Sequence, residues 1–416
     1  MRLSPRTALA AAAIFHIILI LSLFGVGRLG WAGEKIDRDG IGEFARDSRP
    51  YKIAVAQLAD LLKQGQVQSW IHSPEQFHLK VYSLSVLPLG FLFGNNILAV
   101  ELLNLLYYLT ILALVFGLGK LVAGERAAWL AAFIVAFWPS LLLHTTQFLR
   151  DPLVLTAFLA LFTILTLLLK ENLTWRYAAG AAIAGAVSMS VVWHSRREIW
   201  PVITAVVLLS ALLLLIKIAC LRKLFTFNLV VMAALIVLTF MMSRPATGVV
   251  GQPQSNAPKV SSFWRRVANV RIGFISEGMN VSGSMIDADV TFNSGTDVIK
   301  YVPRALEISY LAPFPLMWFK TGYNVGRLGR LISGLEMTLT YLFEALACFF
   351  VWRTKKHFSS WLLVLTTMIG MLALGLVVAN VGTLYRMRYP FWVLLVIMGA
   401  GALVNLRTAK TSTASA

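Results

Sequence analysis

The chain has 416 residues, of which 58% are apolar and only 13% are charged, and this composition excludes an ordinary soluble domain. Several runs of about 20 residues are almost free of charge, the length that an α-helix needs to cross a bilayer. The formal net charge of +18 is also typical of nucleic-acid-binding proteins, but here the basic residues lie in short patches between apolar runs. Loops that face cytoplasm and anionic lipid have this arrangement, so we predict a polytopic membrane protein with no nucleic-acid partner.

Ten segments are long and apolar enough to be spanning helices, and the first, after a basic N-terminus, is longer than the apolar part of a signal peptide. We therefore expect an uncleaved first span. Placing the N-terminus inside puts a basic patch on the cytoplasmic side of every even-numbered crossing, as the positive-inside rule requires. The predicted fold is an all-α polytopic bundle of about ten transmembrane helices with two large external loops. The predicted spans are residues 8–27, 97–119, 127–148, 152–169, 177–193, 200–219, 226–242, 331–352, 359–379 and 389–406.

The predicted topology divides the chain into six segments, which are the first span (1–27), the first external loop (28–96), spans two to seven (97–242), the second large external loop (243–330), the last three spans (331–406) and a cytoplasmic tail (407–416). In the first loop, Pro50 suits the first turn of a helix that we expect to lie flat on the membrane. The run 81–96 contains Pro88 and is too short to cross, so we place it at the outer interface. The apolar stripe of the first of these helices comprises Ile53, Ala56, Leu58 and Leu61 or Leu62. The second loop opens with a Pro-, Gly- and polar-rich linker at 243–259.

Arginines and acids appear in external turns where the predicted topology does not favour them. Such turns are normally poor in arginine, yet three of them carry guanidinium groups. Because these turns meet at the mouth of the bundle, the guanidiniums together would bind a phosphate or pyrophosphate. The residues in question are Arg150, Asp151, His194, Arg196, Arg197, Glu198, Arg386 and Arg388, with Asp47 in the first external loop.

An anion site beside a carboxylate suits the transfer of a group from a phosphate. A sugar that reaches the external face of a membrane usually arrives on a lipid phosphate, because nucleotide sugars are not available there. Transfer needs a base that deprotonates the acceptor hydroxyl, and cations that stabilise the charge on the departing phosphate. The sequence offers no convincing covalent nucleophile, Ser/His pair or Gly-rich phosphate loop.

Three stretches of the sequence resemble the GT-C superfamily of lipid-phosphate-sugar glycosyltransferases, which includes protein O-mannosyltransferases, lipid A aminoarabinose transferases and lipopolysaccharide-core transferases. "DSRPYKIAVAQL" at 47–58 is similar to the Asp-Ser-x-x-Tyr-x-x-Ala pattern in the first external loop of that superfamily. The stretch 87–132 resembles its interface helix, second span and Gly-Glu-Arg turn, and 381–403 resembles its late Arg-Tyr-Pro element before a final span. The resemblance covers residues 37–200 and 380–404 well and the second external loop poorly.

The resemblance implies a role for several residues. Asp47 matches the catalytic aspartate, a general base or a group that orients the acceptor; the alternative is a loop aspartate paired with Arg46 or Arg49. Arg386 and Arg388 match arginines that contact the lipid-linked phosphate in the superfamily. The alternative is that their side chains extend to anionic lipid headgroups. Arg197, with Arg196 as an alternate, matches an Arg-x-Glu element, against a structural ion pair with Glu198. Further candidate substrate contacts are Tyr51, Asp151, Arg150, His194 and Glu198.

No cofactor is expected, although Asp37 and Asp39 form an Asp-x-Asp motif that holds a divalent metal in some members of the superfamily. The predicted function is an inverting glycosyltransferase that moves a monosaccharide from a polyprenyl phosphate to a hydroxyl of a glycan, lipid or protein. The expected setting is a bacterial inner membrane with the site on the periplasmic face, or the lumen of the endoplasmic reticulum in a eukaryotic host. The alternatives are a lipid-linked-sugar transporter or flippase, and a polysaccharide polymerase or ligase.

Overall fold

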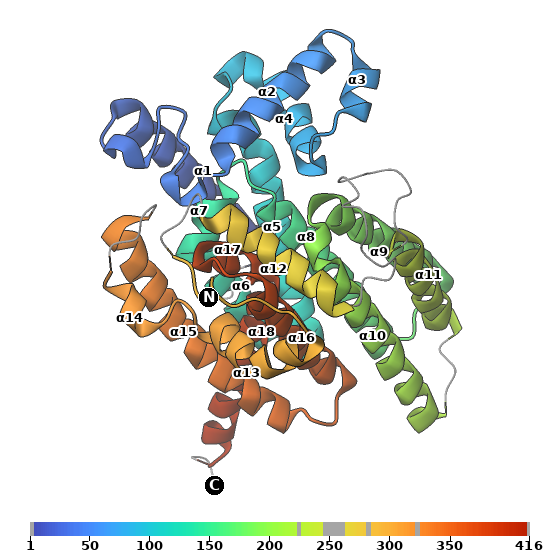
Figure 1. Ribbon diagram of the computed structural model, residues 1–416. Helices are drawn as coiled ribbons and strands as arrows, with labels where there is room; N and C mark the ends of the chain where they lie inside the picture. Colours follow the sequence, from blue (N-terminus) through green and yellow to red (C-terminus); the bar gives the residue numbers. More distant parts are fainter. Residues whose placement is uncertain (1–3, 223–225, 244–262, 280–283, 321–324, 414–416) are drawn as a thin grey trace.

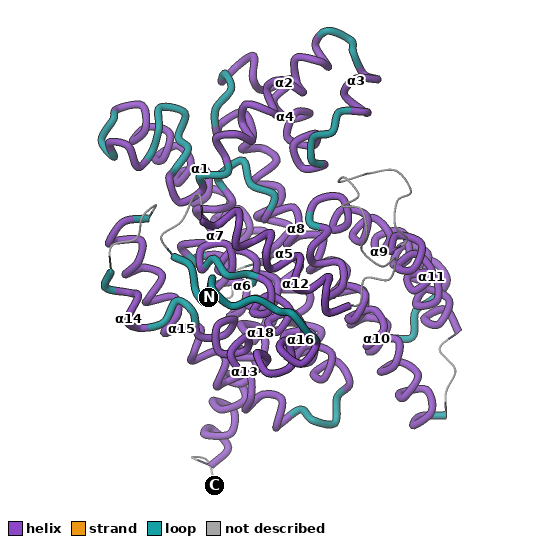
Figure 2. Tube along the Cα trace, viewed as in Figure 1, coloured by secondary structure: helices purple, strands orange, loops and turns teal. Residues whose placement is uncertain are grey.

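The structure is a computed structural model that describes residues 4–222, 226–243, 263–279, 284–320 and 325–413. Within these residues the chain is built from helices joined by short loops, as Figure 2 shows, and it contains no strand beyond two isolated β-bridges. One bridge joins Ile36 to Gly42 and the other joins Met285 to Asn380. The all-helical polytopic class that the sequence predicts is therefore confirmed.

The long apolar helices coincide with the predicted spans (Figure 1). Nine single helices of the described residues are long and apolar enough to cross a membrane. They include α1 (Pro5–Leu29), α5 (Glu101–Ala123), α8 (Asp151–Lys170), α9 (Trp175–Ser195), α10 (Trp200–Leu221), α11 (Thr226–Ser243), α15 (Gly326–Arg353), α16 (Phe358–Val377) and α18 (Tyr389–Thr413). The segment 407–416, predicted as a tail, continues α18 to Thr413, and its last three residues lie outside the described residues.

The third predicted span, 127–148, is not one helix. It consists of α6 (Glu125–Ala136) and α7 (Pro139–Thr145), which meet at an angle of 65°. Pro139 can start a helix but cannot continue one, because it lacks the N–H that the preceding turn needs. Trp138 at the break packs against Trp392, with ring centroids 4.4 Å apart, and this contact fixes the bend.

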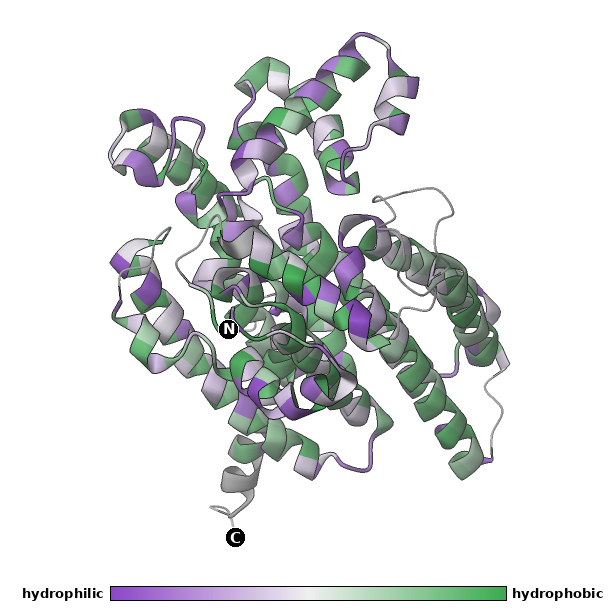
Figure 3. Cartoon of the chain, in the orientation of Figure 1, coloured by the Kyte–Doolittle hydropathy of each residue, from purple (hydrophilic) through white to green (hydrophobic). Residues whose placement is uncertain are grey.

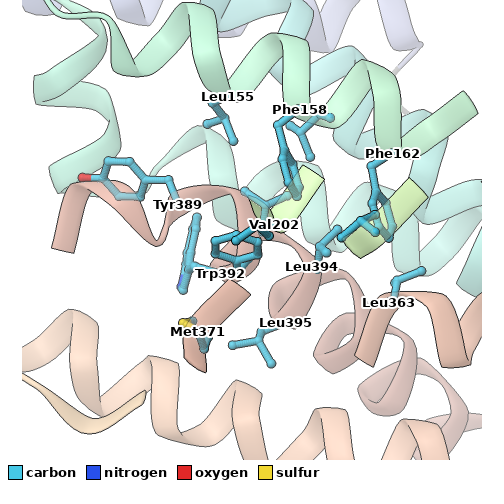
Figure 4. Packing of buried hydrophobic residues seen from close by; sticks show 14 of the residues in the cluster. Leu155, Phe158, Phe162, Val202, Leu363, Met371, Tyr389, Trp392, Leu394 and Leu395 are labelled. Carbon is cyan, nitrogen blue, oxygen red and sulfur yellow. The ribbon is translucent and has the colours of Figure 1, made fainter. Parts of the chain in front are cut away.

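The centre of the bundle is α18, which packs against α15, α6, α5 and α16. Figure 4 shows Tyr389, Trp392, Leu394 and Leu395 of this helix among side chains of α8 and α16. The outer helices α10 and α11 are predominantly hydrophobic, as expected of surfaces that face lipid (Figure 3). Because lipid is as apolar as these side chains, close packing rather than expulsion from water holds such helices together.

The first external loop folds into three helices, α2 (Ser48–Lys63), α3 (Val67–His72) and α4 (Phe77–Phe93). The last is too short to count as a span and packs against α2, and a short 3₁₀ helix (Ile97–Val100) joins it to α5. The buried face of α2 comprises Val55, Leu58 and Ala59, whereas Ile53 is 58% exposed. Leu58 therefore belongs both to the predicted membrane-facing stripe and to the face that packs on α4, whereas Ile53 lies on the exposed side of the helix.

The second external loop, to which the sequence assigned no structure, contains α12 (Phe263–Met279), α13 (Gly295–Leu311) and the short α14 (Pro315–Trp318). Most of its predicted linker, 244–259, lies outside the described residues. Both α12 and α13 pack against α16, where Arg271, 1% exposed, lies against the rings of Phe292 and Tyr301. Its guanidinium donates hydrogen bonds to backbone oxygens of Leu376 (3.1 Å) and Asp287 (2.7 Å), which ties the loop to the end of α16.

The same loop also fixes the short helix α17 (Val381–Met387), which precedes α18. The Ile286 N–H donates to the Ala379 carbonyl at 2.9 Å, and the Val381 N–H donates to the Ser284 carbonyl at 3.0 Å. The side chain of Asn380 accepts hydrogen bonds from the N–H groups of Gly382 and Thr383 and so caps the helix. The position of α17 is therefore set by the second external loop.

We expect Gly375→Ala to destabilise the bundle, because a Cβ at this position would lie 1.9 Å from the backbone oxygen of Ala305 in α13. Overpacking costs about 1–3 kcal/mol, and a backbone atom cannot move aside as a side chain can. Gly117→Ala, on α5, is the matched control, because nothing lies within 4 Å of its added Cβ. Thermal unfolding in detergent should show a lower melting temperature for Gly375→Ala alone, and equal melting temperatures would contradict the close approach of α13 and α16.

Candidate functional site

Asp47, at the start of α2, and Arg386, in α17, form an ion pair. The Arg386 guanidinium donates a hydrogen bond from Nη2 to Asp47 Oδ2 at 2.5 Å, across 339 positions of sequence. Asp47 stands at the N-cap position of α2 but makes no capping hydrogen bond, because its carboxylate is turned toward α17 instead. The Asp47 side chain is 46% exposed and that of Arg386 only 17%, so one face of the carboxylate stays open.

A second ion pair lies directly behind the first. Asp151, at the start of α8, accepts a hydrogen bond from Arg196 Nη2 at 2.8 Å, and both side chains are buried. Arg386 Nη1 lies 3.8 Å from Asp151 Oδ2, so Arg386 stands between two carboxylates. Burial disfavours the charged guanidinium, but Asp151 and Asp47 outweigh it and raise the pKa of Arg386. At Arg196, burial lowers the pKa although Asp151 opposes the shift.

Arg150, Tyr51 and His78 lie beside these pairs. The Arg150 guanidinium donates to the Ser195 carbonyl at 3.3 Å and to Gln76 Oε1 at 3.4 Å. The rings of Tyr51 and His78 meet edge to face with centroids 4.8 Å apart. Burial raises the pKa of Tyr51. The positive charge of Arg150 opposes this increase but does not cancel it. The first external loop therefore contributes Asp47, Tyr51 and His78 to one group of polar residues. We call this group, together with Arg150, Asp151, Arg196 and Arg386, the cluster.

A buried polar network inside the bundle holds α17 and the start of α18 in place. Tyr385, next to Arg386, donates its hydroxyl to the carboxylate of Glu336 on α15, which is 2% exposed and also accepts from the Ser140 N–H at 2.8 Å. The Tyr389 hydroxyl lies 2.7 Å from Nδ1 of His144 at the end of α7. Polar side chains inside an apolar bundle are costly unless paired, so this network marks a place where α17 must be held in one orientation.

Some of the predicted site residues meet in this cluster. Asp47, Tyr51, Arg150, Asp151, Arg196 and Arg386 come together. The alternative pairing of Asp47 with Arg46 or Arg49 is not found, because Arg49 binds Glu43 and Asp37 instead. Of the two arginines proposed for the Arg-x-Glu element, Arg196 is the one that joins the cluster.

The remaining predicted residues lie elsewhere. Arg388 is 2% exposed and donates to the Ala312 carbonyl at 2.7 Å, so it points into the bundle and does not reach headgroups. Arg197 is exposed and its guanidinium lies 4.3 Å from the ring centroid of Trp193 rather than on the exposed Glu198. His194 is exposed, and its Nδ1 hydrogen-bonds the Ser190 carbonyl of its own helix.

The two acids of the Asp-x-Asp motif are used within their own loop. Asp37 Oδ1 accepts hydrogen bonds from the N–H groups of Asp39 (3.0 Å) and Ile41 (2.9 Å), and Asp39 binds Lys52. Among the described residues, no three His, Cys, Asp or Glu side chains are grouped so that they could hold a metal ion. The motif shapes the turn that leads to Asp47.

A cavity of about 570 Å³ opens at the end of α1, beside this turn. Its walls carry both signs of charge, from Glu34, Asp37 and Glu43 and from Arg28, Arg38 and Arg49. Asp47 and its partner Arg386 are not among the residues that line this cavity.

His78, Glu336 and Tyr385 belong to the site or its support, and sequence reasoning did not find them. His78 lies in an apolar helix and Glu336 in a predicted span. An acid within a predicted span is the one signal that could have pointed to Glu336, and Glu344 of the same span carries it too.

Comparisons of this chain with protein-family models, with curated proteins and with solved structures found no match. The conclusions about function therefore depend on the residues and their geometry.

We expect Asp151→Asn to destabilise the protein strongly, because it leaves the buried Arg196 guanidinium without its carboxylate. Breaking a buried ion pair by removing one partner costs about 3–5 kcal/mol. The matched control is Asp60→Asn, which removes the exposed Asp60–Lys63 pair on α2, worth about 0–1 kcal/mol. Thermal unfolding in detergent compares the two variants; similar melting temperatures would show that the Asp151 pair is not buried.

Proposed function

We propose that the chain is a glycosyltransferase that takes a monosaccharide from a polyprenyl phosphate and gives it to a hydroxyl of a glycan, lipid or protein. The observation that carries the proposal is the pairing of Asp47 with Arg386, backed by Asp151 and Arg196, at the end of the bundle where the external loops meet. This arrangement supplies a half-exposed carboxylate and a group of arginines at one place, which are the two requirements of the reaction.

In the proposed reaction, Asp47 accepts the proton of the acceptor hydroxyl as its oxygen attacks the anomeric carbon of the sugar. The bond between that carbon and the phosphate oxygen breaks, and its electron pair stays with the phosphate. The arginines stabilise the charge that develops on this leaving group. Arg386 holds the Asp47 carboxylate in a fixed direction, which supplies orientation before the reaction begins. Displacement in one step inverts the configuration at the anomeric carbon, as the resemblance to the GT-C superfamily implies.

The surroundings of Asp47 support separate places for the two substrates. The polyprenyl tail lies in the bilayer beside the spanning helices, so its phosphate reaches the cluster from the membrane side. The acceptor approaches Asp47 from the side on which its carboxylate is exposed. The membrane in question would be a bacterial inner membrane, with the site on its periplasmic face.

One observation favours a second candidate, a flippase for a lipid-linked sugar. Transporters often bind substrate where a spanning helix is broken, and α6 and α7 form such a broken span. However, α7 ends at Thr145, and the next residues that carry charge are Arg150 and Asp151 of the cluster. The break thus leads directly to the same site, which suits an enzyme equally well.

We expect Asp47→Asn to reduce sugar transfer by a factor of about 10²–10⁴, the usual contribution of a general base. The assay uses the purified protein in lipid nanodiscs with a panel of polyprenyl-phosphate sugars and acceptors. Asp60→Asn, on the same helix, should keep full activity.

Three other results would redirect the proposal. Full activity in Asp47→Asn combined with loss in Asp37→Asn would move the base to the Asp-x-Asp motif. Transfer that survives both changes would remove the role of a first-loop carboxylate. If the native protein in vesicles moves the donor between leaflets without consuming it, the flippase is the correct function.

A further inference from the structure

His78 is a buried imidazole with no hydrogen-bond partner. It lies in the first turn of α4, is 1% exposed, and neither ring nitrogen has a hydrogen-bond partner among the described residues. Buried polar groups in proteins are almost always paired, and leaving one unpaired destabilises the folded state. A ligand can supply the partner that such a group lacks, so we looked for a ligand that would bind His78.

Charged and titratable groups from four helices surround His78. Tyr51 faces it from α2 and Tyr82 from α4 itself, while Arg150 and Asp151 face it from the start of α8 and Arg196 from the end of α9. Burial, and next the positive charge of Arg150, lowers the pKa of His78 to about 3. The imidazole is therefore neutral at physiological pH and carries one N–H donor and one acceptor.

Arg150 differs from the other arginines of the cluster. Arg386 and Arg196 each have a carboxylate oxygen within 4 Å, but among the described residues Arg150 has only neutral acceptors, Gln76 and the Ser195 carbonyl, both at 3.3 Å or more. Its positive charge is thus the least compensated. Two further groups, Ser195 Oγ and Arg196 Nε, lie at the end of α9. They are buried and also lack hydrogen-bond partners in the described structure.

We propose that Arg150 and His78 bind the phosphate group of the substrate where α4 lies beside the start of α8 and the end of α9. Arg150 supplies the charge, and His78 donates its N–H to a phosphate oxygen. Arg386 then keeps its contact with Asp47, so the base and the anion site use different arginines. This inference rests on the proposed function. It assigns the phosphate of the sugar donor to Arg150 and His78 rather than to Arg386 and Arg388.

The test measures binding without any acceptor, so it does not depend on sugar transfer. Native protein in nanodiscs is titrated with a polyprenyl phosphate and with the corresponding polyprenol. We expect His78→Phe, which keeps a ring against Tyr51, and Arg150→Gln each to weaken binding of the polyprenyl phosphate about tenfold or more, the effect of losing a hydrogen bond to a charged group. Polyprenol should bind weakly and equally to all three proteins. His72→Phe, on the exposed α3 of the same loop, is the control and should bind as the native protein does.

Two readouts separate this proposal from a structural role and from the proposed function. The ¹⁵N resonances of the His78 ring, identified by their absence in His78→Phe, should shift when polyprenyl phosphate is added; a structural histidine would not respond. Competition by inorganic phosphate means that the phosphate group alone is recognised, and lack of competition means that the lipid phosphate is required. Equal affinity of the native protein and both variants, or an unchanged His78 resonance, would overturn the proposal. Phosphate binding that depends on His78 in a protein that transfers no sugar would instead contradict the glycosyltransferase and leave the phosphate site standing.

Discussion

The contact between Asp47 and Arg386 is the interaction on which the site depends, because it joins the first external loop to α17, 339 positions later in the sequence. Neither residue is in the position that stabilises an ordinary surface residue. Asp47 does not cap α2, and Arg386 is largely withdrawn from water beside a second, buried carboxylate, Asp151. Taking charges out of water has a cost that a single ion pair does not reliably offset, so such a network is weak evidence for stability. It is stronger evidence for a site in which charged groups must be fixed before a charged substrate arrives.

The rest of the molecule holds this contact in place from two sides. On one side, α2 packs on α4, and the turn around Asp37 and Asp39 leads the chain into Asp47. On the other side, the second external loop pairs with the segment before α17 through backbone hydrogen bonds, and Glu336 binds Tyr385 from within the bundle. The external loop that resembles no known pattern therefore has a clear structural part, since it sets the direction of the helix that carries Arg386.

The spanning helices could be predicted from the sequence because twenty apolar residues have few structures open to them in a bilayer. The bend in the third span was missed, although Pro139 marked it, because hydropathy averages across a break of two residues. Within the site, loop arginines that violate the positive-inside rule pointed to Arg150, Arg196 and Arg386, since their charge needs an explanation. The same rule pointed to Arg197 and Arg388, and it could not tell that one lies over Trp193 and the other inside the bundle. His78 could not be identified from the sequence, because what distinguishes it is that neither ring nitrogen has a hydrogen-bond partner among the described residues.

Cross-linking between positions 47 and 386 tests most directly whether the first external loop and α17 build one site. Asp47→Cys and Arg386→Cys are combined in a chain whose two native cysteines, Cys220 and Cys348, are replaced by serine, and a protease site is placed between the two new cysteines. In membrane vesicles a short bifunctional thiol reagent should keep the cleaved halves together. The pair Asp60→Cys and Arg386→Cys is the control, since position 60 lies about 20 Å further along α2 at the rise of an α-helix. Efficient cross-linking of the first pair alone is the predicted result. No cross-linking of 47 to 386, or equal yields for both pairs, would contradict the shared site and the function that we derive from it.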